Sequence, residues 1–326
     1  MSQPVVFVTR IIPEEGLAPL RAAARLDVWP DELPPDHAAL CERVRGVDGL
    51  LCLLTDPVDA AVMDAAGPGL KVISQMAVGT DNIDRAAATA RGIPVGHTPG
   101  VLTDATADFT WALLMAAARR VVEADAFTRA GRWQTWGPTL LAGADISGAV
   151  LGIVGLGRIG QAVARRAQGF EMQVLYHDRQ RDPEAEARLG VEFAPLDDLL
   201  RAADFVTLHV PLTAETHHLI SAAQFALMKP SAILVNTARG PVVDPAALAD
   251  ALRERRIAAA ALDVTDPEPI PPDSPLLALD NLIITPHIAS ASIRTRGRMA
   301  AMAAENLLAG LRGERLPHCA NPEVYG

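Results

Sequence analysis

Lysine is nearly absent from the 326-residue chain. Of its 29 basic residues, only Lys71 and Lys229 are lysines. Neither lysine lies in a GxxxxGK[ST] loop, which excludes a P-loop nucleotide hydrolase. Lys71 opens an apolar run and Lys229 precedes a proline, so neither position favours a Schiff-base enzyme.

Cysteines and long apolar runs are also scarce. The three cysteines, Cys41, Cys52 and Cys319, form no CxxC pair, which argues against structural zinc and a disulfide framework. We expect them to be small buried hydrophobic side chains. No uncharged apolar run reaches the roughly 18 residues of a membrane span, and the chain enters a strand pattern without a charged leader. We therefore expect a cytoplasmic protein without membrane contact.

The chain also has no excess of positive charge, since its net charge is −10. A basic face for a phosphate backbone is not expected, so nucleic acid is not a predicted partner. Half of the residues are apolar and 21% are charged, which is the balance of a globular protein. At roughly 100 to 200 residues per domain, the length predicts about two domains.

Short apolar runs alternate with segments of helix length along the whole chain. Such runs are typical of parallel strands that are covered on both faces. In the first part they occupy 5–10, 49–55, 70–77 and 93–95, and in the middle they begin near 150, 173, 205, 232, 259 and 282. The pattern predicts an α/β protein with two doubly wound parallel sheets, in which six middle strands form a dinucleotide-binding domain.

Two longer helical segments accompany these strands. Residues 103–133 read as a single helix that begins at a Thr103/Asp104 cap and ends near Gly131. A second helix is expected at about 291–312. Because the roughly 35 residues after the last strand are too few for a domain, we expect the chain to return to its first lobe.

The most specific local signal is a glycine motif between an expected strand and an amphipathic helix. Gly155, Gly157 and Gly160 stand in GxGxxG register. The first glycine permits a tight turn, the second lets backbone approach a pyrophosphate, and the third allows close helix packing. Asp178 ends the next expected strand, where a carboxylate binds ribose hydroxyls. The motif therefore predicts a dinucleotide site.

Three polar residues follow later strand ends, namely Arg239 in NTARG, Glu268 in DPEP and His287 in TPH. Taken singly, each has an ordinary structural explanation as a surface cation, a loop carboxylate or a boundary histidine. Ligands of open parallel sheets bind beyond the carboxyl ends of the strands, so these side chains are expected to converge on one crevice. Their joint placement beyond a nucleotide site favours catalysis.

The chain resembles the D-isomer-specific 2-hydroxyacid dehydrogenases, most closely the glyoxylate/hydroxypyruvate reductases. The resemblance extends over nearly the whole chain, through LKVISQMAVGTDNID, VGHTPGVLTDATAD, VGLGRIGQA, VNTARGPVVD, LDVTDPEP, ITPHIASA and NLLAGLRGE. It implies a Rossmann NAD(P)-binding domain at 99–287, inserted into a flavodoxin-like substrate-binding domain made of 1–98 and 288–326.

The resemblance also implies which residues form the site. Arg239, Glu268 and His287 become the catalytic residues, and the backbone amides of Val78 and Gly79 bind the substrate carboxylate. No metal is implied. The cofactor residues implied are Gly155, Gly157, Arg158, Ile159, Gly160, Asp178, Arg179, Pro211, Thr237 and Asp263, although a buried structural role is an equal alternative for Asp263.

Elementary chemistry agrees with these roles. Reduction of a 2-oxo acid needs an acid beside the carbonyl oxygen, and imidazolium suits that task near neutral pH. A carboxylate on the ring, assigned to Glu268, stabilises the charged form and orients it. Arg239 can pair with the substrate's carboxylate and carbonyl oxygens through its planar fork. The expected partner is a small 2-oxo or 2-hydroxy acid.

The sequence VLYHDRQRD contains residues that favour NAD and residues that favour NADP. Asp178 favours NAD, because its charge would repel a 2′-phosphate. Arg179 and Arg181 follow at once and favour NADP, because arginine accommodates that phosphate. We give the carboxylate more weight. Its repulsion of a nearby 2′-phosphate must be overcome before the attraction of the solvent-screened arginines can favour NADP. NAD is the preferred prediction and NADP the alternative.

One position departs from the resembled family. Leu140 occupies a slot where the closest relatives carry a tryptophan that reaches into the partner subunit's active site, which puts substrate-size selectivity in question. Trp133 and Trp136 remain nearby. We expect a homodimer contact from about 120 to 145, with packing inside the subunit as the alternative.

Two further functions compete with 2-oxo acid reduction. Formate- or phosphite-type dehydrogenases keep the hydride chemistry with a different donor. Corepressor-like proteins of the same fold sense NAD(H) without catalysis, and fold alone does not separate these possibilities. The chain lacks long disordered extensions that would recruit partners, which favours an enzyme.

Overall fold

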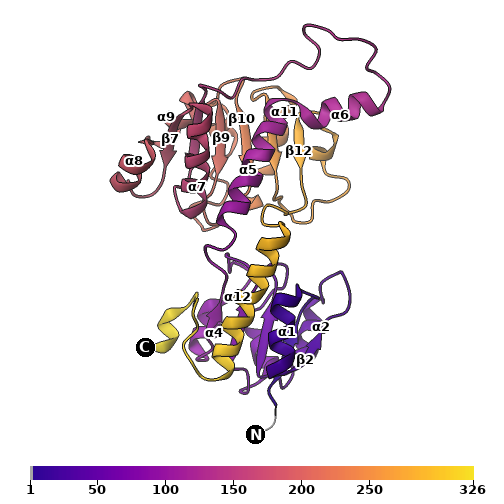
Figure 1. Cartoon of the computed structure of the whole chain (residues 1–326), viewed down its shortest axis with the longest axis vertical. Helices are drawn as coiled ribbons and strands as arrows, with labels where there is room; N and C mark the ends of the chain where they lie inside the picture. Colours follow the sequence, from indigo (N-terminus) through magenta and orange to yellow (C-terminus); the bar gives the residue numbers. More distant parts are fainter. Residues whose placement is uncertain (1–2) are drawn as a thin grey trace. The chain divides into compact units, whose positions relative to one another are not determined.

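A computed structural model describes residues 3–326, which form two compact units (Figure 1). The first unit combines the chain up to Leu102 with Ala291–Gly326, and the second is Thr103–Ser290. We call them the five-stranded unit and the seven-stranded unit after their sheets.

The five-stranded unit contains a wholly parallel sheet in the order β2-β1-β3-β4-β5. This is the flavodoxin-like order. Its strands are β1 (Val5–Val8), β2 (Arg25–Val28), β3 (Gly49–Cys52), β4 (Val72–Gln75) and β5 (Val95–Gly96). The sequence did not reveal β2, because this edge strand reads RLDV, has no fully buried residue and lacks an apolar run.

Helices cover both faces of this sheet. On one face lie α1 (Glu14–Ala23) and α12 (Ile293–Leu311), and on the other α2 (His37–Arg43), α3 (Ala60–Ala66) and α4 (Arg85–Ala90). Figure 1 shows α1 and α12 side by side. Gly16 permits this contact, because a Cβ there would lie 2.7 Å from the Ala300 carbonyl oxygen. A short turn, η4 (Pro322–Tyr325), ends the chain.

The seven-stranded unit has a parallel sheet in the order β12-β11-β10-β9-β6-β7-β8. The order reverses between β6 and β9, which creates the switch point where ligands bind in such sheets. Its strands are β6 (Val150–Val154), β7 (Gln173–His177), β8 (Glu192–Phe193), β9 (Phe205–Leu208), β10 (Ile233–Asn236), β11 (Ala259–Leu262) and β12 (Leu282–Ile284). Six of the seven strands were expected. The seventh, β8, is a two-residue exposed edge strand.

Two apolar clusters fill the space between this sheet and its helices. One face packs against α5 (Thr103–Ala118), α7 (Arg158–Ala167) and α8 (Pro183–Leu189). The other packs against α9 (Leu196–Ala202), α10 (Ala222–Phe225) and α11 (Pro245–Arg253). Short turns complete the unit, namely η1 (Gln168–Phe170), η2 (Gly240–Val242) and η3 (Pro275–Ala278). The predicted fold class is confirmed.

The single helix expected over 103–133 is wrong. It is divided into α5 and α6 (Val121–Arg129) by Arg120, which has a left-handed φ of 52°. The Ala118 carbonyl accepts the N–H of Ala144 at 2.9 Å rather than continuing the helix. Gly143 makes this approach feasible, because a Cβ there would lie 2.2 Å from that carbonyl oxygen. The returning chain therefore ends α5.

The cysteines are all free, but only Cys52 is buried, so the expectation of burial is wrong for Cys41 and Cys319, which are half-buried. Cys41 lies on the partly exposed side of α2, and Cys319 lies in the irregular C-terminal segment. Across residues 3–326, no helix combines the length and apolarity needed to cross a bilayer.

Candidate active site

The glycine turn joins β6 to α7 at the switch point of the seven-stranded unit. Gly155 has a φ of 97°, a conformation that side chains disfavour. A Cβ at Gly160 would lie 2.1 Å from the Gly155 carbonyl oxygen, so the helix packs directly on the turn. At Gly157, the N-cap of α7, a Cβ would meet nothing within 4 Å. Open space before the helix N-terminus fits a pyrophosphate.

Asp178 braces this turn from the end of β7. Its carboxylate accepts the N–H of Leu156 at 2.8 Å and that of Arg179 at 2.7 Å. An open pocket of about 490 Å³ lies beside it, lined by Leu156, Asp178, Gln180, Arg181, Asp182, Pro183 and Glu184. The carboxylate thus lies where the ribose of a nucleotide on the glycine turn is expected.

His209 lies directly against the turn at the end of β9. A Cβ at Gly155 would lie 2.8 Å from the His209 carbonyl carbon, so the two backbones touch. The residue is half-buried, and its Nε2 is buried with no hydrogen-bond partner within residues 3–326. Burial lowers the pKa of His209 from 6.5 to about 3. The ring is therefore neutral at physiological pH.

We expect this histidine to make the protein acid-sensitive. Below pH 6.5 the unfolded chain binds a proton at His209, whereas the folded chain does not until about pH 3. Between these limits the free energy of unfolding should fall with decreasing pH by about 1.4 kcal/mol per unit from this residue. Urea titrations of the wild type and His209→Gln measure the difference. Parallel pH dependences would contradict the expectation.

The three predicted catalytic residues follow adjacent strands. Arg239 follows β10, Glu268 lies in the loop after β11, and His287 follows β12. These strands are neighbours in the sheet and run parallel, so their carboxyl ends share one edge. The sheet explains why residues separated by up to 48 positions in sequence belong to one side of the unit.

Glu268 and His287 are in direct contact. The Nδ1 of His287 lies 2.6 Å from Oε1 of Glu268, and both side chains are partly accessible to solvent. Because the carboxylate accepts the hydrogen bond from Nδ1, the Nε2 edge remains for a ligand. Within the described chain, no protein group bonds Nε2. This is the arrangement of an oriented acid.

Asp263 holds the turn that carries His287. Its carboxylate is 1% exposed and accepts hydrogen bonds from the Thr285 hydroxyl at 2.6 Å and the Ile288 and Ala289 amides at 2.8 and 2.7 Å. The His287 amide donates to the Asp263 carbonyl at 2.8 Å. These bonds support His287 in a left-handed conformation with a φ of 55°.

Arg239 is half-buried at the start of η2. Its guanidinium donates to the Ala238 carbonyl at 2.8 Å, and its own carbonyl accepts the Asn236 side-chain amide at 2.9 Å. The next residue, Gly240, touches the Glu268 loop, because a Cβ there would lie 1.8 Å from the Thr265 carbonyl oxygen. Glycine therefore lets the Arg239 loop and the Glu268 loop meet.

The predicted carboxylate-binding residues lie in the five-stranded unit, in the loop after β4. The carbonyl of Val78 faces Nδ1 of His97 at 3.0 Å, and the carbonyl of Gly79 accepts the Gln75 amide at 2.6 Å. The N–H groups of Val78 and Gly79 have no acceptor within residues 3–326. Their carbonyls are engaged and their amides remain available for an anion.

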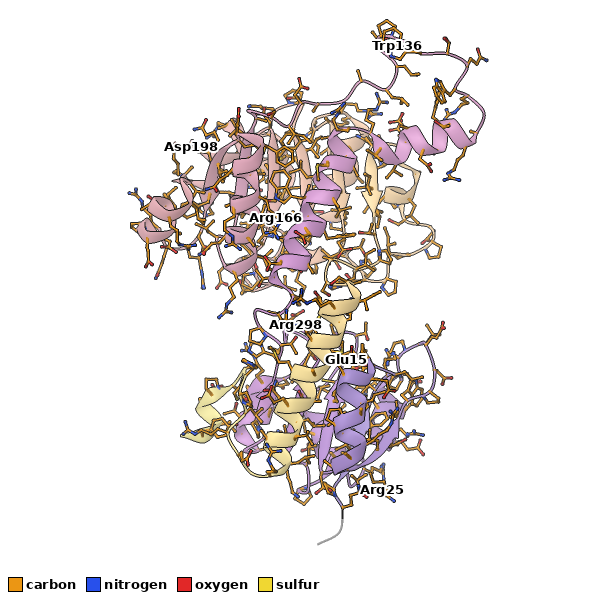
Figure 2. All side chains as sticks on the ribbon, in the orientation of Figure 1. Glu15, Arg25, Trp136, Arg166, Asp198 and Arg298 are labelled. Atoms are coloured by element: carbon orange, nitrogen blue, oxygen red, sulfur yellow. The ribbon has the colours of Figure 1, made fainter. Side chains whose placement is uncertain are left out.

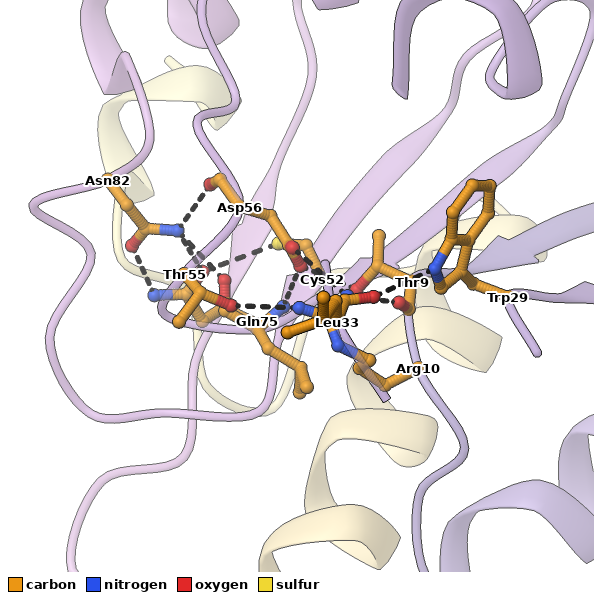
Figure 3. Close-up of polar contacts among 10 residues, drawn as sticks. Thr9, Arg10, Trp29, Leu33, Cys52, Thr55, Asp56, Gln75 and Asn82 are labelled. Carbon is orange, nitrogen blue, oxygen red and sulfur yellow. Dashed lines mark hydrogen bonds and ion pairs between the residues drawn. The ribbon is translucent and has the colours of Figure 1, made fainter. Parts of the chain in front are cut away.

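A buried polar network supports this loop (Figure 3). The side-chain amides of Gln75 and Asn82 bond each other in both directions, at 2.6 and 3.0 Å. Asn82 also donates to the Leu53 and Asp56 carbonyls at 3.0 and 2.8 Å. The network thus ties the loop after β4 to the loop after β3.

The other predicted cofactor residues all lie on the seven-stranded unit. Arg158 and Ile159 form the first turn of α7, and Arg179 is an exposed residue beyond β7. Pro211 follows β9. Thr237 follows β10, and its hydroxyl bonds that of Thr110 at 2.8 Å. All of them follow carboxyl ends of strands β6, β7, β9 and β10.

Comparisons with known proteins extend over the full chain. The family model for the NAD-binding domain of D-isomer specific 2-hydroxyacid dehydrogenases matches residues 111–289. A glyoxylate reductase of Korarchaeum cryptofilum is 57% identical over 323 residues, which cover 99% of this chain and 97% of the relative. One from Thermofilum pendens is 52% identical, with coverage of 99% and 96%.

Solved structures agree. A crystal structure of a Thermus thermophilus protein matches with a TM-score of 0.92 and 52% identity, and covers 97% of this chain and 99% of that one. The NADPH-dependent glyoxylate/hydroxypyruvate reductase of Sinorhizobium meliloti, in complex with NADP and malonate, matches with a TM-score of 0.88 and 33% identity, covering 99% and 98%.

Two parallel α/β units and a glycine turn at a switch point are typical of a nucleotide-dependent dehydrogenase. The chain belongs to the D-isomer specific 2-hydroxyacid dehydrogenase family. It is an oxidoreductase that uses NAD or NADP and acts on small 2-oxo or 2-hydroxy acids.

Sequence reasoning missed several residues that shape this site. Gln75, Asn82 and Thr285 act on neighbouring groups, and nothing in their spacing distinguishes them from ordinary polar residues. Gly240 is part of the family-like motif VNTARGPVVD, and the motif alone gives it no separate role. Its signal was the position directly after a strand-end arginine, where close backbone approach is a reason for glycine.

Proposed function

We propose that the protein reduces glyoxylate and hydroxypyruvate to the corresponding 2-hydroxy acids. The observation that carries the proposal is the 2.6 Å contact of His287 with Glu268 on the same unit as the glycine turn. Relatives named glyoxylate reductase at 57% and 52% identity support the choice of substrate.

Each residue has a defined task in this reaction. The Nε2 of protonated His287 donates a proton to the substrate's carbonyl oxygen, while Glu268 orients the ring. Arg239 offers its planar fork to the substrate's oxygens. The amides of Val78 and Gly79 bind its carboxylate. A bound reduced nicotinamide supplies the hydride for C2.

The glycine turn and the pocket beside Asp178 are proposed to hold the dinucleotide, with NAD preferred over NADP. Open space at Gly157 and the Asp178 carboxylate support this assignment. Asp263 is proposed as a cofactor residue with a structural role as well, since its oxygens already accept three hydrogen bonds.

A panel of 2-oxo acids tests the substrate. Oxidation of NADH and NADPH is followed by absorbance with glyoxylate, hydroxypyruvate, pyruvate and larger 2-oxo acids, and reduction of NAD and NADP with formate and phosphite. We expect the highest kcat/KM with glyoxylate or hydroxypyruvate. A preference for formate or phosphite would overturn the proposal in favour of a formate- or phosphite-type dehydrogenase.

We expect Glu268→Gln to narrow the pH range of reduction. The neutral amide still accepts a hydrogen bond from Nδ1, but it no longer attracts the positive charge on the ring. The decline of kcat/KM at rising pH should therefore begin at lower pH. The measurement is a pH profile of kcat/KM with glyoxylate. Glu254→Gln, a substitution on the surface of the same unit, is measured in parallel as the control. Superimposable profiles of Glu268→Gln and wild type would contradict the expected effect of the Glu268 charge on the His287 ring.

We also propose a homodimer formed through an arm, defined as α6 with residues 130–142. Helix α6 buries no residue. Beyond it, Trp133 is 61% and Trp136 is 78% exposed, so packing inside the subunit does not account for them. Figure 2 shows Trp136 at the tip of the arm. Leu140, also exposed, lies on the same segment.

Sedimentation should give about twice the chain mass of 34.5 kDa. A double variant, Trp133→Ser with Trp136→Ser, is expected to sediment as a monomer, because it removes the apolar surface that a partner would cover. Phe193→Ser is the control, an exposed aromatic outside the arm. A wild type that remains monomeric at all concentrations would contradict the dimer.

We propose a cytoplasmic location, supported by three thiols that are all free. Fractionation of cells that produce the chain at native level would test it. Recovery outside the cytoplasmic fraction would overturn the proposal.

A further inference from the structure

The pocket beyond β7 is bordered by a loop of unusual charge, DRQRDPEAE, from 178 to 186. Asp182 caps α8 by accepting the Ala185 amide at 3.0 Å, and Pro183 begins the helix. Asp182 also donates its own N–H to the Tyr176 hydroxyl at 2.7 Å. These bonds fix the direction in which the loop enters α8.

Arg181 lines the pocket, yet its fork is already engaged. Its Nε donates to Oε1 of Glu186 at 2.8 Å, and a terminal nitrogen donates to Oε2 at 2.7 Å. The Tyr176 hydroxyl donates to the same carboxylate at 2.7 Å. Glu186 is 15% exposed and does not line the pocket, so it binds Arg181 from behind. Bidentate pairs of this geometry are the stronger arginine contacts.

Arg179 provides the contrast. It is exposed, and its side chain forms no hydrogen bond or ion pair within residues 3–326. Of the two arginines in the loop, only Arg179 has no contact that fixes its direction, whereas Arg181 is turned toward Glu186 and paired with its charge. Asp178 adds a negative charge at the pocket wall. The pocket therefore presents less positive charge than its sequence suggests.

We propose that Glu186 determines cofactor selectivity by holding Arg181, so that the pocket favours an adenosine with a free 2′-hydroxyl over one with a 2′-phosphate. Glu186 is a positioning residue, because it acts through Arg181. The inference rests on the proposed nucleotide site beside Asp178 and is independent of the substrate acid.

The charge state of Glu186 supports this role. Hydrogen bonds from Arg181 and Tyr176 lower its pKa to about 2. The carboxylate is thus ionised at any pH at which the enzyme is assayed, and its hold on the guanidinium does not vary across that range.

Binding of two adenosine fragments tests the proposal without catalysis. The probes are 5′-AMP and 2′,5′-ADP, which differ only in the 2′-phosphate, and their dissociation constants are measured by calorimetry. Glu186→Gln removes the negative charge and one of the two acceptors that hold Arg181, so its guanidinium can turn to the phosphate. We expect the affinity for 2′,5′-ADP relative to 5′-AMP to rise about five- to tenfold. The ratio of kcat/KM for NADPH over NADH should rise in parallel.

Three matched variants separate this mechanism from simpler ones. Glu192→Gln removes a charge from the exposed edge strand β8, outside the pocket lining and without releasing Arg181, so its ratio should change less than twofold. Adding Arg181→Ala to Glu186→Gln should abolish the gain. Arg181→Ala alone should leave the ratio near wild type, because Arg181 is already occupied.

Each outcome is decisive. An equal gain in Glu192→Gln would assign the effect to net charge alone and overturn the proposal. A wild type that loses 2′,5′-ADP affinity on Arg181→Ala would show that Glu186 does not withhold that side chain. Should Glu186→Gln fold poorly, this single-arginine variant still tests the inference. Failure of 5′-AMP to bind the wild type would instead overturn the nucleotide site, whichever acid is reduced.

Discussion

Replacing His287 with Gln should lower kcat for 2-oxo acid reduction by about 10²- to 10⁴-fold, the usual contribution of a positioned general acid. The glutamine amide can keep a hydrogen bond to Glu268, which lies 2.6 Å from the native Nδ1. It cannot deliver a proton to the substrate oxygen. Because the turn around residue 287 is held through the backbone and Asp263, the fold should be unchanged.

The measurement is single-turnover reduction of glyoxylate, with cofactor affinity determined separately by fluorescence titration. His37→Gln, on α2 of the five-stranded unit, serves as the control for the loss of an imidazole. The cofactor dissociation constant should be unaltered in both variants. Near-wild-type turnover of the His287 variant would remove this residue from the mechanism.

Replacing Asp263 with Ala should cost both stability and activity. The change leaves the Thr285 hydroxyl and the Ile288 and Ala289 amides without their acceptor. Unpaired buried donors of this kind destabilise a protein by roughly 2 to 4 kcal/mol in total. The left-handed turn at His287 loses its support, so kcat should fall about 100-fold, the scale seen when a catalytic group is displaced by about 1 Å.

Urea denaturation gives the stability change, and the rate at saturating glyoxylate gives kcat. Asp273→Ala is the control, because Asp273 is an exposed carboxylate in the loop between β11 and β12. A variant with unchanged stability would mean that water replaces the carboxylate. Full activity despite lost stability would show that Asp263 stabilises the turn but is not needed to position His287.

The sequence was most informative where backbone geometry demands a particular residue type. Gly155 and Gly160 could be placed correctly because only glycine tolerates a φ of 97° or a backbone contact at 2.1 Å from its Cβ position. Glu268 and His287 could be expected together because parallel strands share one carboxyl edge. Their contact, at 2.6 Å, was expected because an imidazolium acid needs a carboxylate on its ring, once the family resemblance had assigned both residues to catalysis.

Features decided by tertiary contact could not be predicted. The break at Arg120 depends on Ala144 returning to the Ala118 carbonyl, which local helix propensity does not encode. The engagement of Arg181 depends on the entry of α8, and sequence alone left that arginine as a free candidate for a 2′-phosphate. The roles of Arg239, Glu268, His287, Val78 and Gly79 remain predictions.

The packing of α12 beside α1 has a consequence for synthesis of the chain on the ribosome. Val6, Val8 and Val72 belong to the apolar cluster that α12 completes, yet α12 follows the whole seven-stranded unit in the chain. The seven-stranded unit is contiguous and has its whole sequence available earlier. The strands of the five-stranded unit therefore wait for a helix that is made only after the seven-stranded unit. Until then α1 alone covers this apolar face of the sheet, and chaperones and aggregation compete for the remainder.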